Sequence, residues 1–355
     1  MICICVGTRP NFIKAAPIIR EMEKQDIPYR LLHTGQHFDD NMSAAFFRDL
    51  DMPQPHINLH GGVPDWSPTL QIAHIMMSFE SYLAEAKPDL VMVLGDVDSS
   101  LACALVAKKM GIRIAHVEAG ERSGDRTMPE EINRILIDEM ADILFCASEQ
   151  AFSIFPFHPS CHLVGNVMID QLRHDEPKLK NYATIDLAFA VLTLHRQSNV
   201  DDFKVFAEIW QTMQAIAKTI RIFFPVHPRT LPMVQKAIGK FGKHEQLIIL
   251  DPLPRLDFMT MVANARFVMT DSGGLQVETS YLNVPCLTLR ENTEWSETIS
   301  RGSNFLTGTD LEKIFGAVQE ILYGEWKQSE FKDDPFYGVH AAEKIVGILK
   351  QEGYK

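Results

Sequence analysis

The sequence predicts an α/β protein built from two Rossmann-like, doubly wound domains that face each other across a cleft. Three observations lead to this fold class. Short apolar runs alternate with helix-length segments of mixed charge along nearly the whole chain, as is typical of parallel sheets. The alternating series occurs twice, before and after a polar stretch at residues 176–182. The length of 355 residues also suits two domains of ordinary size.

The elements follow one another in a regular order. In the first series, apolar runs predict buried strands at residues 2–6, 29–33, 90–94, 112–117 and 143–146, with helices at 68–86 and 101–110 among the connections. The second series predicts strands at residues 188–194, 222–226, 247–250, 267–270 and 286–289, with helices at 203–219 and 231–241. A final amphipathic helix is expected after the turn at 335–338. We therefore expect one domain over residues 1–167 and a second over residues 168–338.

Composition and charge exclude several classes of protein. Lys and Arg number 34 against 46 Asp and Glu, and the net charge of −12 disfavours general binding to nucleic acid. The cysteines at 3, 5, 103, 146, 161 and 286 form no CxxC motif, so we expect reduced, buried thiols. The apolar start of the chain is too short for a signal peptide or a membrane span, which predicts a cytoplasmic protein without membrane contact.

Anion-binding groups are expected where the first predicted strand ends. Gly7 opens a turn into a helix whose free N–H groups favour an anion, and Arg9 and Lys14 add two cations. The alternative is an ordinary strand-to-helix turn with surface charges. The turn matches neither a Walker A loop nor a GxGxxG fingerprint.

Acidic residues follow the next predicted strands of the first series. Asp96 comes directly after the strand at 90–94, and Glu118 after the strand at 112–117. Ligands of such sheets bind beyond the carboxyl ends of the strands, so both are candidate proton-transfer groups. For Asp96 a helix N-cap is the alternative. Glu130 follows Pro129 in a Pro-Glu-Glu run, which suits either a helix start or a third acid in the same cleft.

Phosphate-binding groups are expected in the second series. His195 and His227 follow two strands, each near an arginine, in a pattern that suits phosphate binding or proton transfer. Ser272, Gly273 and Gly274 follow another strand and begin a helix, so the backbone can approach a phosphate closely. Glu278 lies one turn along, where a carboxylate suits two ribose hydroxyls. Neither HExxH, a Cys/His cluster nor GxSxG is present, so no metal or cofactor is expected.

Taken together, these segments resemble the non-hydrolysing UDP-N-acetylglucosamine 2-epimerase family. The matching stretches follow in order through nearly the whole chain: GTRPNFIKAAP, TGQHFDD, PDLVMVLGDVDSS, HVEAGERSGDRTMPEEINR, VGNVMID, TLHRQSNVDD, FPVHPR, TDSGGLQVE and PCLTLRENTE. The resemblance implies a glycosyltransferase-B-like fold, a homodimer, and a C-terminal helix, within residues 339–355, that packs back on the first domain. The implied activity is interconversion of UDP-N-acetylglucosamine and UDP-N-acetylmannosamine through a 2-acetamidoglucal.

The resemblance also implies a role for each candidate residue. The family's catalytic acids match Asp96, Glu118 and Glu130, and its active-site histidine matches His195. Arg9 and Lys14 match residues that contact the nucleotide sugar in the family, and Ser272, Gly273 and Gly274 match its diphosphate-binding loop. Glu278 matches the residue that binds the ribose. The segment around Leu253 and Phe258 matches the uracil pocket.

Two departures from the family pattern leave alternatives open. Trp295 stands where many members have an arginine, so a modified UDP-2-acetamido sugar, such as a 2,3-diacetamido uronate, is an alternative substrate. Trp295 filling a gap in the second domain is the competing interpretation. Residues 61–67 lack the Gly-Gln of members with a second, activating nucleotide-sugar site, which disfavours such a site here. More distant alternatives are a glycosyltransferase on the same fold and a nucleotide-sugar-binding protein without turnover.

Overall fold

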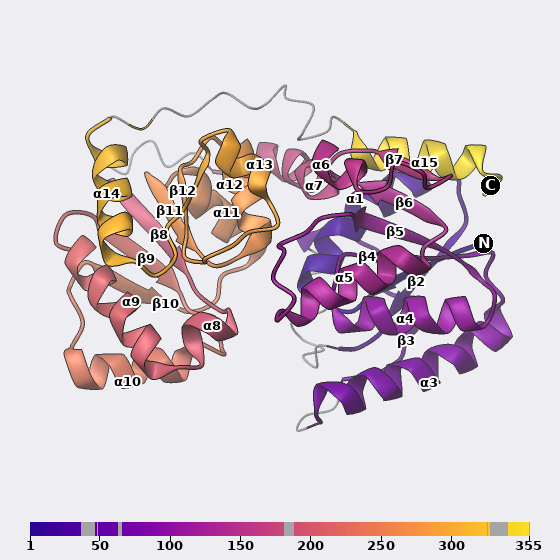
Figure 1. Cartoon of the computed structure of the whole chain (residues 1–355), viewed down its shortest axis with the longest axis horizontal. Coiled ribbons are helices and arrows are strands. Elements are labelled where there is room, and N and C mark those ends of the chain that lie inside the picture. Colours follow the sequence, from indigo (N-terminus) through magenta and orange to yellow (C-terminus); the bar gives the residue numbers. More distant parts are fainter. Residues whose placement is uncertain are drawn as a thin grey trace. The chain divides into compact units, whose positions relative to one another are not determined.

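The structure is a computed structural model of the chain and describes residues 1–36, 47, 49–62, 66–180, 188–324, 326 and 340–354. The chain forms two compact units (Figure 1). The first contains Met1–His174 with Asp333–Lys355, and the second contains Asp175–Lys332. The stretches singled out in the sequence at residues 63–65, 181–182 and 335–338 lie outside the described residues.

The first unit is built on a seven-stranded parallel sheet in the order β3-β2-β1-β4-β5-β6-β7. Its strands are β1 (Ile2–Val6), β2 (Tyr29–His33), β3 (Ile57–Asn58), β4 (Leu90–Leu94), β5 (Arg113–Ala119), β6 (Ile143–Cys146) and β7 (Cys161–Leu163). Its helices are α1 (Arg9–Lys24), α3 (Pro68–Ala86), α4 (Asp98–Lys109), α5 (Pro129–Met140), α6 (Glu149–Ser153), α7 (Val167–Asp175) and α15 (Ala341–Gln351).

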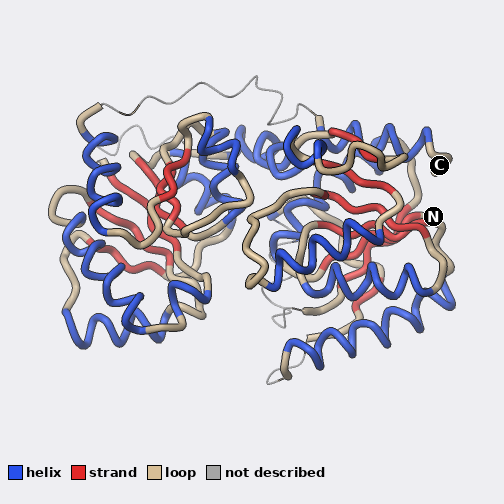
Figure 2. Tube along the Cα trace, viewed as in Figure 1, coloured by secondary structure: helices blue, strands red, loops and turns tan. Residues whose placement is uncertain are grey.

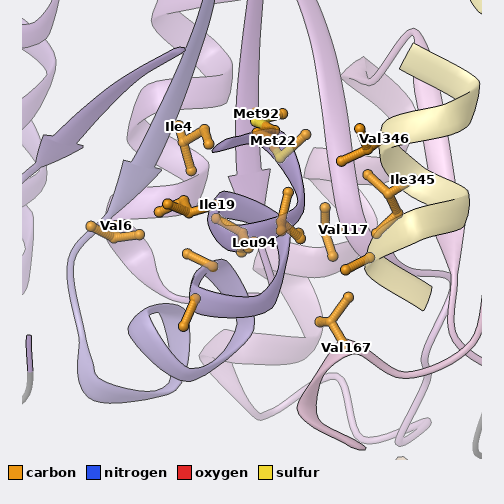
Figure 3. Packing of buried hydrophobic residues seen from close by; sticks show 14 of the residues in the cluster. Ile4, Val6, Ile19, Met22, Met92, Leu94, Val117, Val167, Ile345 and Val346 are labelled. Carbon is orange, nitrogen blue, oxygen red and sulfur yellow. The ribbon is translucent and has the colours of Figure 1, made fainter. Parts of the chain in front are cut away.

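Helices cover both faces of this sheet, because successive side chains of each strand point to opposite sides. Ile2, Ile4 and Val6 of β1 face a core shared with α1 and α15, whereas Cys3 and Cys5 face a core shared with α3, α4 and α5. Figure 3 shows the first of these cores, with Ile345 and Val346 of α15 beside strand residues such as Val117. The last helix of the chain thus completes the core that the first strand begins.

The second unit repeats this plan with a six-stranded parallel sheet in the order β10-β9-β8-β11-β12-β13 (Figure 2). Its strands are β8 (Phe189–Thr193), β9 (Arg221–Pro225), β10 (Leu247–Leu250), β11 (Phe267–Thr270), β12 (Cys286–Thr288) and β13 (Asn304–Leu306). Its helices are α8 (Gln197–Val200), α9 (Phe203–Ile216), α10 (Leu231–Phe241), α11 (Arg255–Ala263), α12 (Gly273–Tyr281), α13 (Ser296–Ser300) and α14 (Leu311–Leu322), with a short 3-10 turn at Glu176–Lys178. The main core lies between the sheet and α9, α10 and α14.

Strand order fixes where a ligand can bind in each unit. In the first sheet β1 pairs with β2 on one side and β4 on the other, and in the second β8 lies between β9 and β11. The carboxyl ends of β1 and β4, and of β8 and β11, are therefore topological switch points, where doubly wound sheets bind ligands. The segments with the candidate residues Arg9, Asp96, His195 and Ser272 follow these four strands.

The element boundaries differ from expectation in informative places. Strand β5 runs to Ala119, two residues beyond the predicted end at 117, and its pairing with β6 shifts register between Val117 and Ala119. Glu118 therefore lies within a bulge at the end of the strand, and not after it. The expected domain boundary at residue 167/168 coincides with the start of α7, whereas the compact units divide after His174. None of the helices that the structure describes is long and apolar enough to cross a bilayer.

Candidate active site

The turn between β1 and α1 is fastened to the end of β4. Asn11 Oδ1 accepts hydrogen bonds from the backbone N–H groups of Gly7 and Thr8, each at 3.1 Å, and its Nδ2 donates to the Leu94 carbonyl at 2.7 Å. Position 7 must be glycine, because a β-carbon there would collide with the Ser99 side chain. The arrangement fixes the start of α1 at the first switch point.

The two cations expected on α1 are Arg9 and Lys14, and the structure places Lys14 beside the acid Glu118. Arg9 is the first residue of α1 and is half-buried. Lys14 is buried and its Nζ lies 2.6 Å from Oε1 of Glu118. Gly95 makes this approach possible: its φ of +61° is in the left-handed region, and a β-carbon would lie 2.6 Å from Lys14 Nζ. Lys14 and Glu118, predicted separately, thus form one ion pair.

Glu118 has the environment of a proton-transfer group. Its backbone adopts the left-handed φ of 70°, which is uncommon for a residue with a side chain. Burial raises the pKa of the Glu118 carboxyl, against the opposing effect of the Lys14 ammonium. Its Oε2 is buried, and among the described residues it has no hydrogen-bond partner. One oxygen therefore binds the cation, and the other is available to exchange a proton.

Asp96 is tied to helix α5. Arg134 of α5 forms an ion pair with Oδ2 of Asp96, and Asn133 donates to the Asp96 carbonyl and to Asp98 Oδ1, each at 2.9 Å. The N-cap of α4 is Val97, so Asp96 does not fill the capping role that the sequence left open. The Asp96 carboxylate, one quarter exposed, is held by a buried arginine.

The two acids of the Pro-Glu-Glu run have different surroundings. Glu131 is buried and accepts hydrogen bonds from the backbone of Ser123 and Gly124, so it holds the preceding loop. Glu130 is half-buried in the first turn of α5. It lies four residues before Arg134, on the same face of the helix. The candidate acid Glu130 and the arginine that binds Asp96 are therefore neighbours on α5.

In the second unit, His195 is paired with Asp271. Its Nδ1 lies 2.9 Å from Asp271 Oδ1, and Asp271 also accepts from the backbone N–H groups of His195 and Arg196 and from Asn199 Nδ2. These donors lower the pKa of the Asp271 carboxyl, although burial opposes them. The His195 side chain is 39% exposed, so a ligand can reach its Nε2. His227 packs beside it, with ring centroids 5.8 Å apart.

The predicted phosphate cradle contains an unexpected acid. Helix α12 begins at Gly273 with Ser272 as its N-cap. A β-carbon on Gly273 would collide with the Glu294 carboxylate, so any other residue here would require Glu294 to move. Glu294 is paired with Arg290 at 2.9 Å, and Arg196 NH2 lies 3.8 Å from its other oxygen. The two arginines offset a negative charge that would otherwise repel a phosphate at Gly273 and Gly274.

The expected ribose and uracil residues are joined by a buried arginine. Arg255 NH2 lies 2.8 Å from Oε1 of Glu278, and its Nε lies 3.0 Å from Asp175. Leu253 and Phe258, both half-buried, lie on either side of Arg255 in the sequence. The ion pair therefore brings the Leu253–Phe258 segment next to Glu278, as a shared nucleoside pocket requires.

Four partner residues were not predicted from the sequence. They are Arg134 as the partner of Asp96, Asp138 as the partner of His116, Arg255 as the partner of Glu278, and Asp271 as the partner of His195. A signal for the first two exists, because Glu130, Arg134 and Asp138 recur every four residues and form one stripe of α5. For Arg255 no spacing indicates its partners, because Asp175 and Glu278 are far away in the sequence. Trp295 is only 2% exposed and lies near Gly273, which favours its interpretation as a packing residue.

Comparison with known proteins identifies the family. The family model described as UDP-N-acetylglucosamine 2-epimerase matches residues 20–350. The UDP-N-acetylglucosamine 2-epimerase of Methanococcus maripaludis is 37% identical to this chain, over 98% of this chain and 97% of its own length. The UDP-N-acetylglucosamine 2-epimerase of Methanocaldococcus jannaschii is also 37% identical, over 99% of both chains. The UDP-2,3-diacetamido-2,3-dideoxy-D-glucuronate 2-epimerase of Pseudomonas aeruginosa is 36% identical over 89% of this chain and 91% of its own.

Solved structures agree with this result. The Methanocaldococcus jannaschii UDP-GlcNAc 2-epimerase in complex with UDP-GlcNAc and UDP is 36% identical, with a TM-score of 0.90 and coverage of 99% of both chains. A lipopolysaccharide outer core galactosyltransferase, 15% identical with a TM-score of 0.58 over 99% of this chain and all of its own, shares the fold alone. The predicted fold class of two Rossmann-like domains, glycosyltransferase-B-like, is confirmed. By sequence over its whole length and by fold, the chain belongs to the UDP-N-acetylglucosamine 2-epimerase family.

Proposed function

We propose that this protein interconverts UDP-N-acetylglucosamine and UDP-N-acetylmannosamine by inverting carbon 2 of the sugar. Family membership over nearly the full length supports this activity. The observation that carries the proposal is the gathering of Glu118 and Asp96, each held by a cation, at the carboxyl ends of β5 and β4. Inversion at carbon 2 requires one acid to remove a proton from one face of the sugar and another to add a proton to the opposite face, and two neighbouring carboxyl groups with different surroundings suit these two roles.

The chemistry follows from the weak acidity of the carbon 2 hydrogen, which has no carbonyl beside it. Elimination solves this problem. A carboxylate takes the carbon 2 proton, the electrons of that C–H bond form the C1=C2 double bond, and the C1–O bond breaks with its electron pair leaving on UDP. The products are UDP and 2-acetamidoglucal. In the return step a carboxylic acid protonates carbon 2 from the other face, and the UDP oxygen bonds to carbon 1.

Inversion needs one proton-transfer group on each face of the sugar, and we assign these roles to the set Asp96, Glu118 and Glu130. The raised pKa of Glu118 suits a group that must both give and take a proton. Two assignments remain open, with Glu118 serving either face. Lys14 beside Glu118 balances the charge that forms when the carboxylate is ionised.

The released UDP must be kept until it adds back, and the proposal assigns this task to the remaining candidates. Arg9, Lys14 and His195 supply positive or donor groups for the diphosphate, and Ser272, Gly273 and Gly274 supply the N-terminus of α12. Glu278 with Leu253 and Phe258 holds the ribose and the uracil. The ion pair of Glu278 with Arg255 orients its carboxylate before the nucleotide arrives.

A second substrate has support from one observation, the 36% identity to the Pseudomonas aeruginosa epimerase that acts on a diacetamido glucuronate. Trp295 is the sequence feature that raised this alternative, and its burial leaves little surface for stacking on a sugar. We therefore favour UDP-N-acetylglucosamine. A kcat/KM for the UDP-diacetamido glucuronate more than about tenfold higher, or ~1.4 kcal/mol, would reverse this choice.

The decisive experiment is NMR of UDP-N-acetylglucosamine incubated with the protein in D₂O, without added cofactor. Deuterium is expected at carbon 2 of both epimers, because the proton exchanges with solvent in the glycal state. The matched control is Glu118→Gln, which keeps the shape of the side chain. A mannosamine product that retains its original hydrogen, or that forms only with NAD, would exclude the elimination mechanism.

We also propose that the protein acts as a cytoplasmic homodimer and needs no nucleic-acid partner. The support is the resemblance of the whole chain to its family and the net charge of −12. Light scattering of the purified protein tests the first part, with a mass of two chains as the expected result.

A further inference from the structure

His116 is a buried histidine that the proposed reaction does not use directly. It lies on β5, two residues before Glu118, and its side chain is fully buried. Its Nδ1 lies 2.6 Å from Asp138 Oδ1, and its Nε2 lies 3.0 Å from the Gly95 carbonyl. Gly95 directly precedes Asp96. One ring therefore connects the strand end that bears Asp96 to helix α5.

Asp138 extends this connection to the other side of Glu118. Its Oδ2 accepts from the Gly120 backbone N–H at 3.1 Å and pairs with Arg122 at 2.6 Å. The backbone on both sides of Glu118, at His116 and at Gly120, is thereby tied to one buried carboxylate of α5. We call His116, Asp138 and Arg122 with their contacts the α5 clamp.

The hydrogen-bond partners fix the orientation of the ring. A carbonyl oxygen only accepts, so Nε2 of His116 carries a hydrogen and donates it to Gly95. On the other side of the ring, Nδ1 is held by the Asp138 carboxyl, whose pKa His116 and Arg122 lower against the effect of burial. Both ring nitrogens are therefore held by protein groups, and the ring cannot turn without breaking one of these contacts.

The backbone that the α5 clamp holds needs external support. Glu118 has a φ of 70°, in the left-handed region that glycines such as Gly95 and Gly120 adopt freely but a residue with a side chain does not. Residues with side chains keep such conformations only where their surroundings enforce them. A small shift of Glu118 relative to Asp96 would matter, because proton transfer depends on positions within about 1 Å.

We propose that His116, held between the Asp138 carboxyl and the Gly95 carbonyl, is a positioning residue that sets the relative placement of the Asp96 and Glu118 carboxyl groups. This inference rests on the proposed epimerase function and adds a residue to it. His116 acts on the acids through Gly95 and through the β5 backbone. Its loss is therefore expected to slow chemistry without weakening nucleotide binding.

A matched pair of variants separates positioning from general support of the fold. Asp138 and Asp142 each accept a hydrogen bond from the backbone at one end of β5. Asp138 Oδ2 accepts from the Gly120 N–H just after the carboxyl end of the strand, and Asp142 Oδ2 accepts from the Ile114 N–H near its amino end, at 2.8 Å. In Asp138→Ala we expect kcat to fall about 10²-fold, with KM changed less than about threefold. In Asp142→Ala we expect kcat within about threefold of wild type. Equal losses of kcat in both variants, or an unchanged kcat in Asp138→Ala, would overturn the proposal.

A conservative variant distinguishes geometry from charge. In Asp138→Asn the amide oxygen can still accept from Gly120, and the amide N–H can donate to Nδ1 of a neutral His116 ring. The α5 clamp keeps its contacts, so we expect kcat to recover to within about tenfold of wild type. Recovery no better than in Asp138→Ala would contradict a positioning role.

The ring itself can be observed in the protein without substrate. In ¹⁵N-histidine NMR, with His116 assigned by its absence in His116→Gln, we expect Nε2 to carry a hydrogen, because its partner, the Gly95 carbonyl, can only accept. An Nε2 without a hydrogen would refute the hydrogen bond through which His116 holds Gly95. This measurement is independent of turnover. If the wild type fails to epimerise UDP-N-acetylglucosamine, the proposed function fails while the state of the ring is still determined.

Discussion

In the part of the chain that the structure describes, each unit pairs a histidine in or directly after a strand with a buried aspartate, and the two pairs differ in exposure. In the first unit His116 and Asp138 are 2.6 Å apart and both are at most 1% exposed. In the second unit His195 and Asp271 are 2.9 Å apart, and His195 is 39% exposed. Both aspartates have a lowered pKa because donors surround them.

Burial decides what each histidine can do. His116 has both ring nitrogens bound to protein groups, so it can hold backbone but cannot reach a ligand. His195 has Nδ1 bound by Asp271 and a side chain that is 39% exposed, so a ligand can reach the ring. Under the proposed roles, the same residue pair positions the acids Asp96 and Glu118 in one unit and contacts the nucleotide in the other.

The largest effect is expected from the acids that the first pair positions. Glu118→Gln should lower kcat about 10²–10⁴-fold, the usual contribution of a general acid or base, and Asp96→Asn and Glu130→Gln should do the same. Affinity for UDP, measured by calorimetry, should change less than about threefold, because the proposed function assigns UDP to other residues. Near-normal turnover in any one variant would assign that residue a structural role only.

An intermediate effect is expected from the second pair. His195→Gln should weaken UDP binding and lower kcat/KM, each about 10–10²-fold, because a donor to a charged phosphate is lost. His244→Gln, a change in the same unit away from the strand ends, is the control. Unchanged affinity for UDP in His195→Gln would mean that the exposed pair does not contact the nucleotide, and the comparison of the two pairs would fail.

A smaller change concerns the titration of Glu118. Lys14 lowers the pKa of this carboxyl and burial raises it, so Lys14→Met should raise its pKa further. ¹³C NMR of labelled glutamate in the free protein, with the signal assigned by Glu118→Gln, measures this directly. A pKa of Glu118 that stays the same or falls would show that the ion pair with Lys14 does not persist in solution.

The smallest effect is expected in acid stability. Asp138 and Asp271 have lower pKa values in the folded state than in an unfolded chain, where Asp titrates near ~3.9. Their contribution to the free energy of unfolding is therefore complete above about pH 5 and is lost as pH falls through the lowered folded values. Asp138→Asn and Asp271→Asn should each lose less stability than the wild type between about pH 5 and pH 2. Urea unfolding followed by circular dichroism checks this, and a wild-type pH dependence in both variants would count against it.

Most of the fold could be predicted because buried parallel strands leave a strong sequence signal. Runs such as residues 90–94 are apolar throughout, since helices cover both faces of the sheet. The short outer strands β3, β7 and β13 were missed, because each includes a polar residue within its two or three positions and so gives no continuous apolar run. The bulge at Glu118 also lacks a sequence signal, since a left-handed glutamate depends on tertiary contacts.

The candidate site could be predicted only in part. Residues at strand ends, such as Asp96 and His195, were found because topology alone brings strand ends together. Their partners Arg134 and Asp271 were not found, because each pairing joins residues far apart in the sequence. Sequence also could not separate His116 from His195, since both are histidines of β-strand ends and only burial distinguishes them.

The packing of α15 has a consequence for how the protein is made. Ile345 and Val346 belong to the core of the first unit, yet they follow the entire second unit in the sequence and leave the ribosome after it (Figure 3). The core of the first unit therefore stays incomplete, with part of its apolar surface exposed, while the ribosome synthesises the entire second unit. Nascent chains of this protein should depend on chaperones during that interval, and chains that terminate early should be recognised by quality control through this unfinished surface.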